Sequence, residues 1–184
     1  MKVLLHICCG PCSIYPIKDL RDEDHVLRGY FFNPNIHPYT EFQKRLETMQ
    51  AYAGKVQLPV IVDDNYELDE FLRQVVFREG ERCRACYAMR LRRAAQVARK
   101  GNFEAFTTTL LVSPFQKHEL IKEIGTAIGF ELGIPFLYKD FRSGYKEAVQ
   151  ISKAEGMYRQ QYCGCIYSER DRYLPNQQKT LNQR

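Results

Sequence analysis

Short apolar runs alternate along this chain with longer segments in which apolar residues recur at helical spacing. The short runs predict five strands, which cover residues 3–7, 26–33, 60–62, 103–109 and 136–138. The longer segments predict helices over residues 14–20, 40–53, 67–76, 86–100, 117–129 and 146–155. Strands that alternate with helices of this length indicate βαβ units and a parallel sheet covered on both faces. The pattern therefore predicts an α/β fold.

The length and the two ends of the chain indicate how it is organised. At 184 residues, of which 45% are hydrophobic, we expect one domain over residues 1–174 and a frayed polar tail over residues 175–184. No apolar run approaches the roughly 20 residues that span a membrane. The N-terminus lacks the long apolar region and cleavage site of a signal peptide. These features predict a cytoplasmic protein.

Polar or sulfur-bearing residues follow three of the predicted strands. Cys8 and Cys9 follow the first strand, and Asp63 and Asp64 follow the third. The fourth strand ends in the hydroxyls of residues 107–109. In open parallel sheets the reactive crevice lies outside the carboxyl ends of the strands, at a topological switch point. We therefore expect the functional site at this edge of the sheet.

Six of the seven cysteines form three close pairs, which are Cys8–Cys9, Cys83–Cys86 and Cys163–Cys165. Paired thiols that folding brings together are typical of iron–sulfur clusters and thiolate-bound metals. In a reducing cytosol this use is favoured over structural disulfides. Six thiols exceed the ligands of one tetrahedral metal or one four-cysteine cluster. The surplus predicts a second reactive centre beside the first.

Each pair carries a different spacing. Cys83 and Cys86 lie within one helical turn and can reach one metal, whereas a thioredoxin-like role would leave the other cysteines unexplained. The glycine between Cys163 and Cys165 permits a backbone in which both sulfurs point at one centre. The side chains of adjacent Cys8 and Cys9 are expected to diverge. One of them would then serve a cluster, while the other serves a second metal or stays catalytic.

Two further groups have alternative roles. Packing as a small hydrophobic residue is favoured over metal binding for Cys12. Asp63 or Asp64 can supply an oxygen ligand to an open iron site or cap a helix. The four histidines match no metal spacing and are expected to be core or surface residues.

The charge is modestly basic, with 27 Lys and Arg against 22 Asp and Glu. Basic residues are concentrated around the second cysteine pair, within 82–100, and Arg159, Arg170 and Arg172 flank the third. Basic residues around a reactive site suit a phosphate-bearing substrate. The alternative is that those on the helix form only a solvated face.

Six sequence blocks occur in order along the chain. They are Cys-Cys-Gly-Pro-Cys-Ser at 8–13, Phe-Phe-Asn-Pro-Asn-Ile-His-Pro at 31–38, Glu-Arg-Cys-Arg-Ala-Cys-Tyr-Ala-Met-Arg-Leu at 81–91, Phe-Thr-Thr-Thr-Leu-Leu-Val-Ser-Pro at 106–114, Phe-Arg-Ser-Gly-Tyr at 141–145 and Tyr-Arg-Gln-Gln-Tyr-Cys-Gly-Cys-Ile-Tyr-Ser at 158–168. In these blocks the chain resembles the QueH family of epoxyqueuosine reductases, which complete the queuosine modification of tRNA. The resemblance extends from residue 3 to about residue 170.

The resemblance implies a Rossmann-like sheet of the HUP type, a [4Fe-4S] cluster and an adjacent mononuclear iron. It also implies reductive removal of an epoxide oxygen from the tRNA wobble base, with electrons from an external donor. Carried over to this chain, the expected metal ligands are Cys8, Cys9, Cys83, Cys86, Cys163 and Cys165. Cys9, Cys83, Cys86 and Cys163 are assigned to the cluster, and Cys8, Cys165 and Asp64 to the reactive centre. Spacing alone leaves the partition between the two metals open.

Two other functions are weighed against this one. An ATP-using, PP-loop-like tRNA thiolation enzyme of the same broad fold predicts a Ser-Gly-Gly-x-Asp-Ser loop after the first strand, where this chain has Cys-Cys-Gly-Pro-Cys-Ser. A non-catalytic, zinc-stabilised RNA-binding module predicts four closed ligands and a colourless protein. The reductase accounts for more of the cysteines than either alternative.

Overall fold

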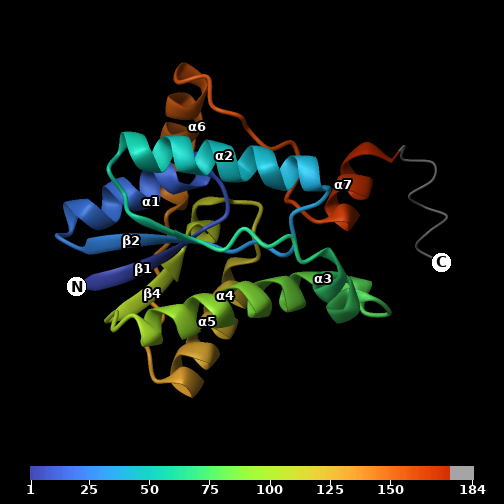
Figure 1. Cartoon of the computed structure of the whole chain (residues 1–184), viewed down its shortest axis with the longest axis horizontal. Helices are drawn as coiled ribbons and strands as arrows, with labels where there is room; N and C mark the ends of the chain where they lie inside the picture. The colour runs from blue at the N-terminus through green and yellow to red at the C-terminus, as the bar shows by residue number, and fades with distance from the viewer. Residues whose placement is uncertain (175–184) are drawn as a thin grey trace.

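Four parallel strands form the centre of the fold in this computed structural model, which describes residues 1–174 (Figure 1). They are β1 (Lys2–Ile7), β2 (Val26–Phe31), β3 (Val60–Val62) and β4 (Ala105–Thr108). Their order in the sheet is β3-β2-β1-β4. Beyond β4, Phe136 adds a single parallel bridge to Phe106, where a fifth strand is predicted. The predicted α/β, Rossmann-like sheet is confirmed. The predicted polar tail, 175–184, lies outside the described residues.

Helices cover both faces of this sheet. They are α1 (Gly10–Asp22), α2 (Tyr39–Lys55), α3 (Leu68–Val75), α4 (Arg82–Lys100), α5 (His118–Leu132), α6 (Tyr145–Ala154) and α7 (Ile166–Tyr173). Figure 1 shows α1, α2 and α6 on one face and α4 and α5 on the other, with α3 and α7 beyond the carboxyl ends of the strands. None of the helices within residues 1–174 is long and apolar enough to cross a membrane.

The central strand β1 is buried along nearly its whole length. From Val3 to Ile7 each side chain is fully shielded from solvent, as a strand covered on both faces requires. Ile7 pairs with Phe31 of β2, and His6 pairs with Thr108 of β4. The chain therefore leaves β1 at the middle of the sheet, and the residues that follow Ile7 emerge between its two neighbouring strands.

The topological switch point lies between β1 and β4. After β3 the chain crosses to the other side of β1, so β1 and β4 are neighbours whose connections run in opposite directions. There the backbone N–H of Cys8 donates to the Thr109 hydroxyl at 3.2 Å. The expectation that cysteine and threonine residues meet at this edge is confirmed. Asp63 and Asp64 follow β3, which is separated from β1 by β2.

Two helices begin four residues earlier than predicted, and one helix is not predicted. α1 begins at Gly10 instead of residue 14, with Pro11 in its first turn, where proline is tolerated. α4 begins at Arg82 instead of residue 86, so both cysteines of the second pair are helical. α7 is not predicted from the sequence at all. It is short and strongly polar, so its apolar spacing gives little signal.

Candidate metal centre

The thiols of Cys8, Cys9 and Cys12 gather where β1 ends and α1 begins. Their sulfur atoms all lie within 4.8 Å of one another. Cys9 has an extended backbone, with φ −169° and ψ 166°, and α1 begins at the next residue, so the first helical turn brings Cys12 back to the strand end. Within residues 1–174 this first thiol group is the one place where three Cys, His, Asp or Glu side chains meet so closely.

One expectation about this group is wrong, and a second stays a prediction. The adjacent side chains of Cys8 and Cys9 do not diverge, because the change from strand to helix turns their sulfurs toward each other, 3.8 Å apart. Packing is the role that the sequence favours for Cys12. Its side chain does pack against the hydrophobic core, and its sulfur also lies beside two other thiols. Cys9 and Cys12 together form a Cys-x-x-Cys motif. This spacing is the sequence signal that marks Cys12 as a candidate metal ligand.

The other two cysteine pairs form a second thiol group. Cys83 and Cys86 lie in the first turns of α4, and Cys163 and Cys165 lie just before α7. Burial raises the pKa of Cys86 to about 12, and Cys163 and Cys165 contribute electrostatically in the same direction. These four thiols therefore share one neighbourhood. Among residues 1–174, no three of their sulfurs are as close together as those of the first thiol group.

Contacts from α2 and from the segment before it anchor the loop that carries Cys163 and Cys165. Arg45 donates to the carbonyl of Cys163 at 2.9 Å and to that of Tyr162 at 3.0 Å. The N–H of His37 donates to the carbonyl of Gly164 at 2.8 Å. Gly164 has φ +146°, a conformation that other residues rarely adopt, which confirms that the loop needs glycine at this position.

A cavity of about 430 Å³ opens beside both thiol groups. Cys8 and Cys12 line it from the first group, and Cys163 lines it from the second. Residues that line the remainder include Phe115, Tyr145, Gln116, Gln160, Arg90 and Arg172. A volume of this size accommodates a small organic group beside the sulfurs.

Two glutamines that the sequence analysis does not identify contact the thiols. The side chain of Gln160 donates to the sulfur of Cys12 at 3.4 Å and accepts from that of Cys9 at 3.3 Å. Gln116 donates to the sulfur of Cys163 at 3.3 Å. In the sequence, only their positions indicate a role at the site. Gln160 precedes the third cysteine pair, and Gln116 follows the strand that ends in threonines.

The thiols of the first group differ in acidity. Hydrogen bonds from Cys12 and Cys9, with help from Arg90, hold the pKa of Cys8 well below the usual thiol range despite its burial. The same contact with Cys8 raises the pKa of Cys12. Cys8 is therefore the thiol of this group that ionises first, and the thiolate is the form that binds metals.

The histidine and aspartate predictions have different outcomes. His6 is buried between Thr108 and the carbonyl of Phe32, and burial lowers its pKa to about 3, so the predicted core role is confirmed for this histidine. Asp64 is exposed and does not line the cavity. Its assignment as an oxygen ligand stays a prediction.

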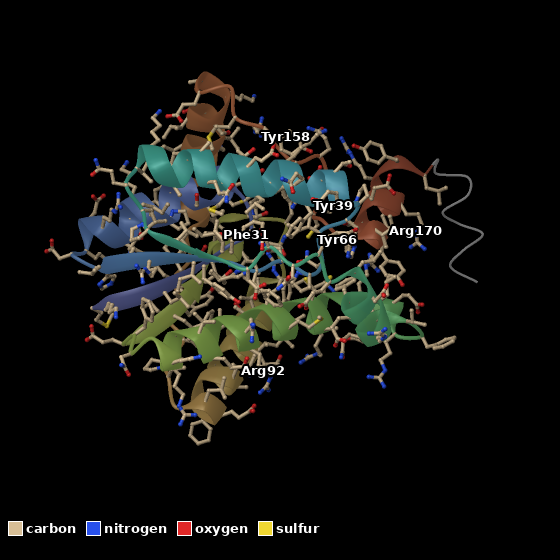
Figure 2. All side chains as sticks on the ribbon, viewed as in Figure 1. Phe31, Tyr39, Tyr66, Arg92, Tyr158 and Arg170 are labelled. Carbon is tan, nitrogen blue, oxygen red and sulfur yellow. The ribbon has the colours of Figure 1, made fainter. Side chains whose placement is uncertain are left out.

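The basic residues of α4 divide into two kinds. Arg84 pairs with Glu123 at 2.9 Å and Arg92 with Glu131 at 2.7 Å, both across to α5. Figure 2 shows Arg92 on the outer side of α4. Arg84 and Arg92 therefore belong to a solvated face of α4, which is the alternative to binding a phosphate-bearing substrate. Arg90 instead points inward and lines the cavity.

Comparison with known proteins places this arrangement in a family. The family model described as Epoxyqueuosine reductase QueH matches residues 3–171, a span that includes all seven cysteines. The chain belongs to the QueH family. A relative named Epoxyqueuosine reductase QueH from Dehalococcoides mccartyi is 38% identical over 172 residues, which cover 94% of each chain.

Other relatives that carry the same name extend this result. The one from Thermotoga maritima is 39% identical, over 90% of this chain and 89% of its own length. The one from Acinetobacter baylyi is 35% identical, over 92% of this chain and 81% of its own length. All three relatives are named as reductases, so membership of the QueH family makes this chain an oxidoreductase.

The donor atoms fit the kind of metal that the family implies. Thiolates are soft ligands that select iron–sulfur clusters, zinc or copper(I) over magnesium or calcium. Both thiol groups lie at the edge of the sheet where reactive sites occur, and four of their seven cysteines are buried, while Cys163 is exposed. Seven thiols in two groups are more than a single tetrahedral metal requires.

Proposed function

We propose that this protein reduces epoxyqueuosine in tRNA to queuosine. The observation that carries the proposal is the pair of thiol groups that flank one cavity in a member of the QueH family. Conversion of an epoxide to an alkene breaks two carbon–oxygen bonds. It consumes two electrons and two protons, and the oxygen leaves as water. The electrons must come from an external donor.

The two thiol groups would hold an iron–sulfur cluster and an adjacent iron. We assign Cys9, Cys83, Cys86 and Cys163 to a [4Fe-4S] cluster and Cys8 and Cys165 to the second iron, with Cys12 as a further candidate ligand because its sulfur is so close to Cys8 and Cys9. Such a centre supplies electrons singly and a Lewis acid for the departing oxygen.

Asp64 is proposed as an oxygen ligand of the second iron. No hydrogen bond or ion pair engages it within residues 1–174, whereas Asp63 is engaged by Tyr30, Asn65 and Arg93. If Asp64 is a ligand, the variant Asp64→Asn should lose the second iron and keep the cluster. Asp63→Asn is the matched control and should keep both. Full iron content in Asp64→Asn would remove Asp64 from the site.

The chain's own side chains would orient the modified base in the cavity. Gln116 and Gln160 present amide groups that already contact sulfur and fix the cavity wall. Phe115 is 82% exposed at the edge of the cavity, and its ring meets that of Tyr145 at 6.1 Å. Exposed aromatic rings are stacking surfaces for bases of single-stranded or splayed RNA. Arg172, also at the cavity, provides a cation for a phosphate.

The proposal is tested with tRNA that carries epoxyqueuosine. The reduced, metal-loaded protein should convert it to queuosine, as measured by mass spectrometry of the nucleosides. Cys163→Ser should abolish conversion, because Cys163 lines the cavity and is assigned to the cluster. Arg92→Gln, which alters only an exposed ion pair on α4, is the control and should convert normally. Absence of conversion by a fully loaded wild-type protein would contradict the proposal.

A further inference from the structure

Arg90, on α4, is a fully buried cation. Only 2% of its surface is exposed, and guanidinium groups remain charged in proteins. One of its terminal nitrogens donates to Asn33 Oδ1 at 2.7 Å, and Asn33 in turn donates to the carbonyl of Ile7 at the end of β1. The Nε of Arg90 has no hydrogen-bond partner within residues 1–174. The guanidinium is therefore fixed in place but incompletely satisfied.

No carboxylate within residues 1–174 balances this charge. Arg90 forms no ion pair within residues 1–174, and residues 175–184 contain no Asp or Glu. Arg45 is the informative comparison, because it is equally buried, at 1% exposed, and pairs with Glu41 at 2.6 Å. A buried charge without a partner is strongly unfavourable, so such groups are retained where an opposite charge is supplied by other means.

The groups around Arg90 are sulfurs from both thiol groups. Its other terminal nitrogen is 3.8 Å from the sulfur of Cys86. Cys8 and Cys163 are its next electrostatic neighbours, and although burial lowers the pKa of Arg90, the three thiols together raise it. Arg90 also lines the cavity with Cys8 and Cys163. The anions nearest to the Arg90 guanidinium are therefore the thiolates of Cys86, Cys8 and Cys163.

We propose that Arg90 is the built-in counter-charge of the metal–thiolate centre and raises its reduction potential. Each electron that enters adds negative charge to thiolate ligands, and a fixed cation that donates to a ligand sulfur stabilises that added charge. Arg90 is a positioning residue here, since it acts on the centre through the sulfur of Cys86. The inference rests on the proposed iron–sulfur centre, but it does not depend on what that centre reduces.

The test compares the midpoint potentials of metal-loaded variants in a spectroscopic redox titration. Arg90→Met removes the charge while keeping an unbranched side chain. Its reduction equilibrium should fall about tenfold, which is 59 mV for a one-electron couple. Arg90→Lys keeps the charge and should show a smaller fall. Arg92→Met, on the same helix but exposed, is the matched control and should keep the wild-type potential.

Iron and sulfide analysis of each variant makes the result decisive. A fully loaded Arg90→Met with the wild-type potential would overturn the proposal, and a raised KM for tRNA in that variant would instead assign Arg90 to substrate binding. If Arg90→Met folds but retains no metal, Arg90→Lys should restore loading, because it restores the charge. Failure of a folded Arg90→Lys to load would overturn the proposal as well. Because the potential is measured without tRNA, these outcomes are separate from failure of the proposed reaction.

Discussion

The side chain of Cys12 has contacts that suit both packing and metal binding. Its sulfur lies within 4.8 Å of two other thiols, accepts a hydrogen bond from Gln160 and faces the cavity. The side chain also packs against the hydrophobic core. The role of Cys12 therefore decides how many thiol ligands a metal bound at this strand end would have.

We predict that Cys12→Ser lowers the iron content of protein purified without oxygen. Serine keeps the size of the side chain and removes the soft sulfur ligand. Loss of even a residue that supports a metal ligand typically weakens metal binding about 10–100-fold, so the loss of Cys12 should lower iron binding by at least this much. Iron per chain is the measurement. Ser13→Ala, a neighbouring change on the same helix, is the control. Wild-type iron content in Cys12→Ser would return Cys12 to a packing role.

Phe115 provides a second prediction at this scale. If its ring stacks on a base of the substrate, Phe115→Ala should raise KM for tRNA about tenfold with kcat nearly unchanged, since one stacked base contributes about 1–3 kcal/mol. Phe130→Ala is the control, because Phe130 is 92% exposed but lies on α5 and does not line the cavity. Equal KM values for the two variants would contradict the stacking role.

Spacing is informative for the cysteine pairs. It predicts that the Cys83 and Cys163 pairs converge, and the structure brings these thiols into one neighbourhood. Their role as metal ligands stays a prediction. Sequence reasoning misses Gln116 and Gln160, because glutamine is common on surfaces and only the folded arrangement brings these amides to sulfur. The adjacency of Cys8 and Cys9 is misleading for the same reason, since the direction of a side chain depends on backbone angles at the strand end.

At the scale of elements, α2 and the chain before it fix the loop that carries the third cysteine pair. The Arg45 guanidinium holds two carbonyls of that loop and is itself held by Glu41, one helical turn earlier. His37 adds a backbone contact. A loop anchored by so many hydrogen bonds presents its thiols in one arrangement before metal binds, which reduces the cost of assembling the site.

Gly164 tests this anchoring. A Cβ at this position would lie 3.2 Å from the side-chain nitrogen of Asn35 and 3.3 Å from a terminal nitrogen of Arg45, at φ +146°. Gly164→Ala should therefore destabilise the protein by about 1–3 kcal/mol and lower its iron content. Gly54→Ala, in a helix with nothing within 4 Å of the added carbon, should be neutral or stabilising. Thermal unfolding of both variants is the measurement, and equal midpoints would contradict the anchoring role.

The elements themselves follow closely from the hydrophobic pattern, because buried strands and amphipathic helices have distinct periods. The pattern does not supply the starts of α1 and α4, where no side chain caps the helix. It also does not supply α7, which is short and mostly polar. Each of these three features positions a cysteine. The parts of the fold that matter most for the site are therefore those that periodicity specifies least.

At the scale of the whole molecule, one sheet edge collects thiols from three distant parts of the chain. The first thiol group follows β1, and the second combines the start of α4 with the segment before α7. A metal centre shared by these segments would tie them together. Removal of the metal with a chelator should therefore lower the melting temperature, because binding to the folded state alone stabilises it. An unchanged melting temperature after metal loss would show that the segments are held by protein contacts only.

The two thiol groups are proposed to bind an iron–sulfur cluster and an adjacent iron. This proposal is tested by counting iron and acid-labile sulfide per chain after purification without oxygen. We expect a brown protein with about five irons and four sulfides per chain. Four irons with four sulfides and no further metal would contradict the second iron alone. A colourless protein that contains zinc and no sulfide would contradict the whole account and favour a zinc-stabilised RNA-binding module.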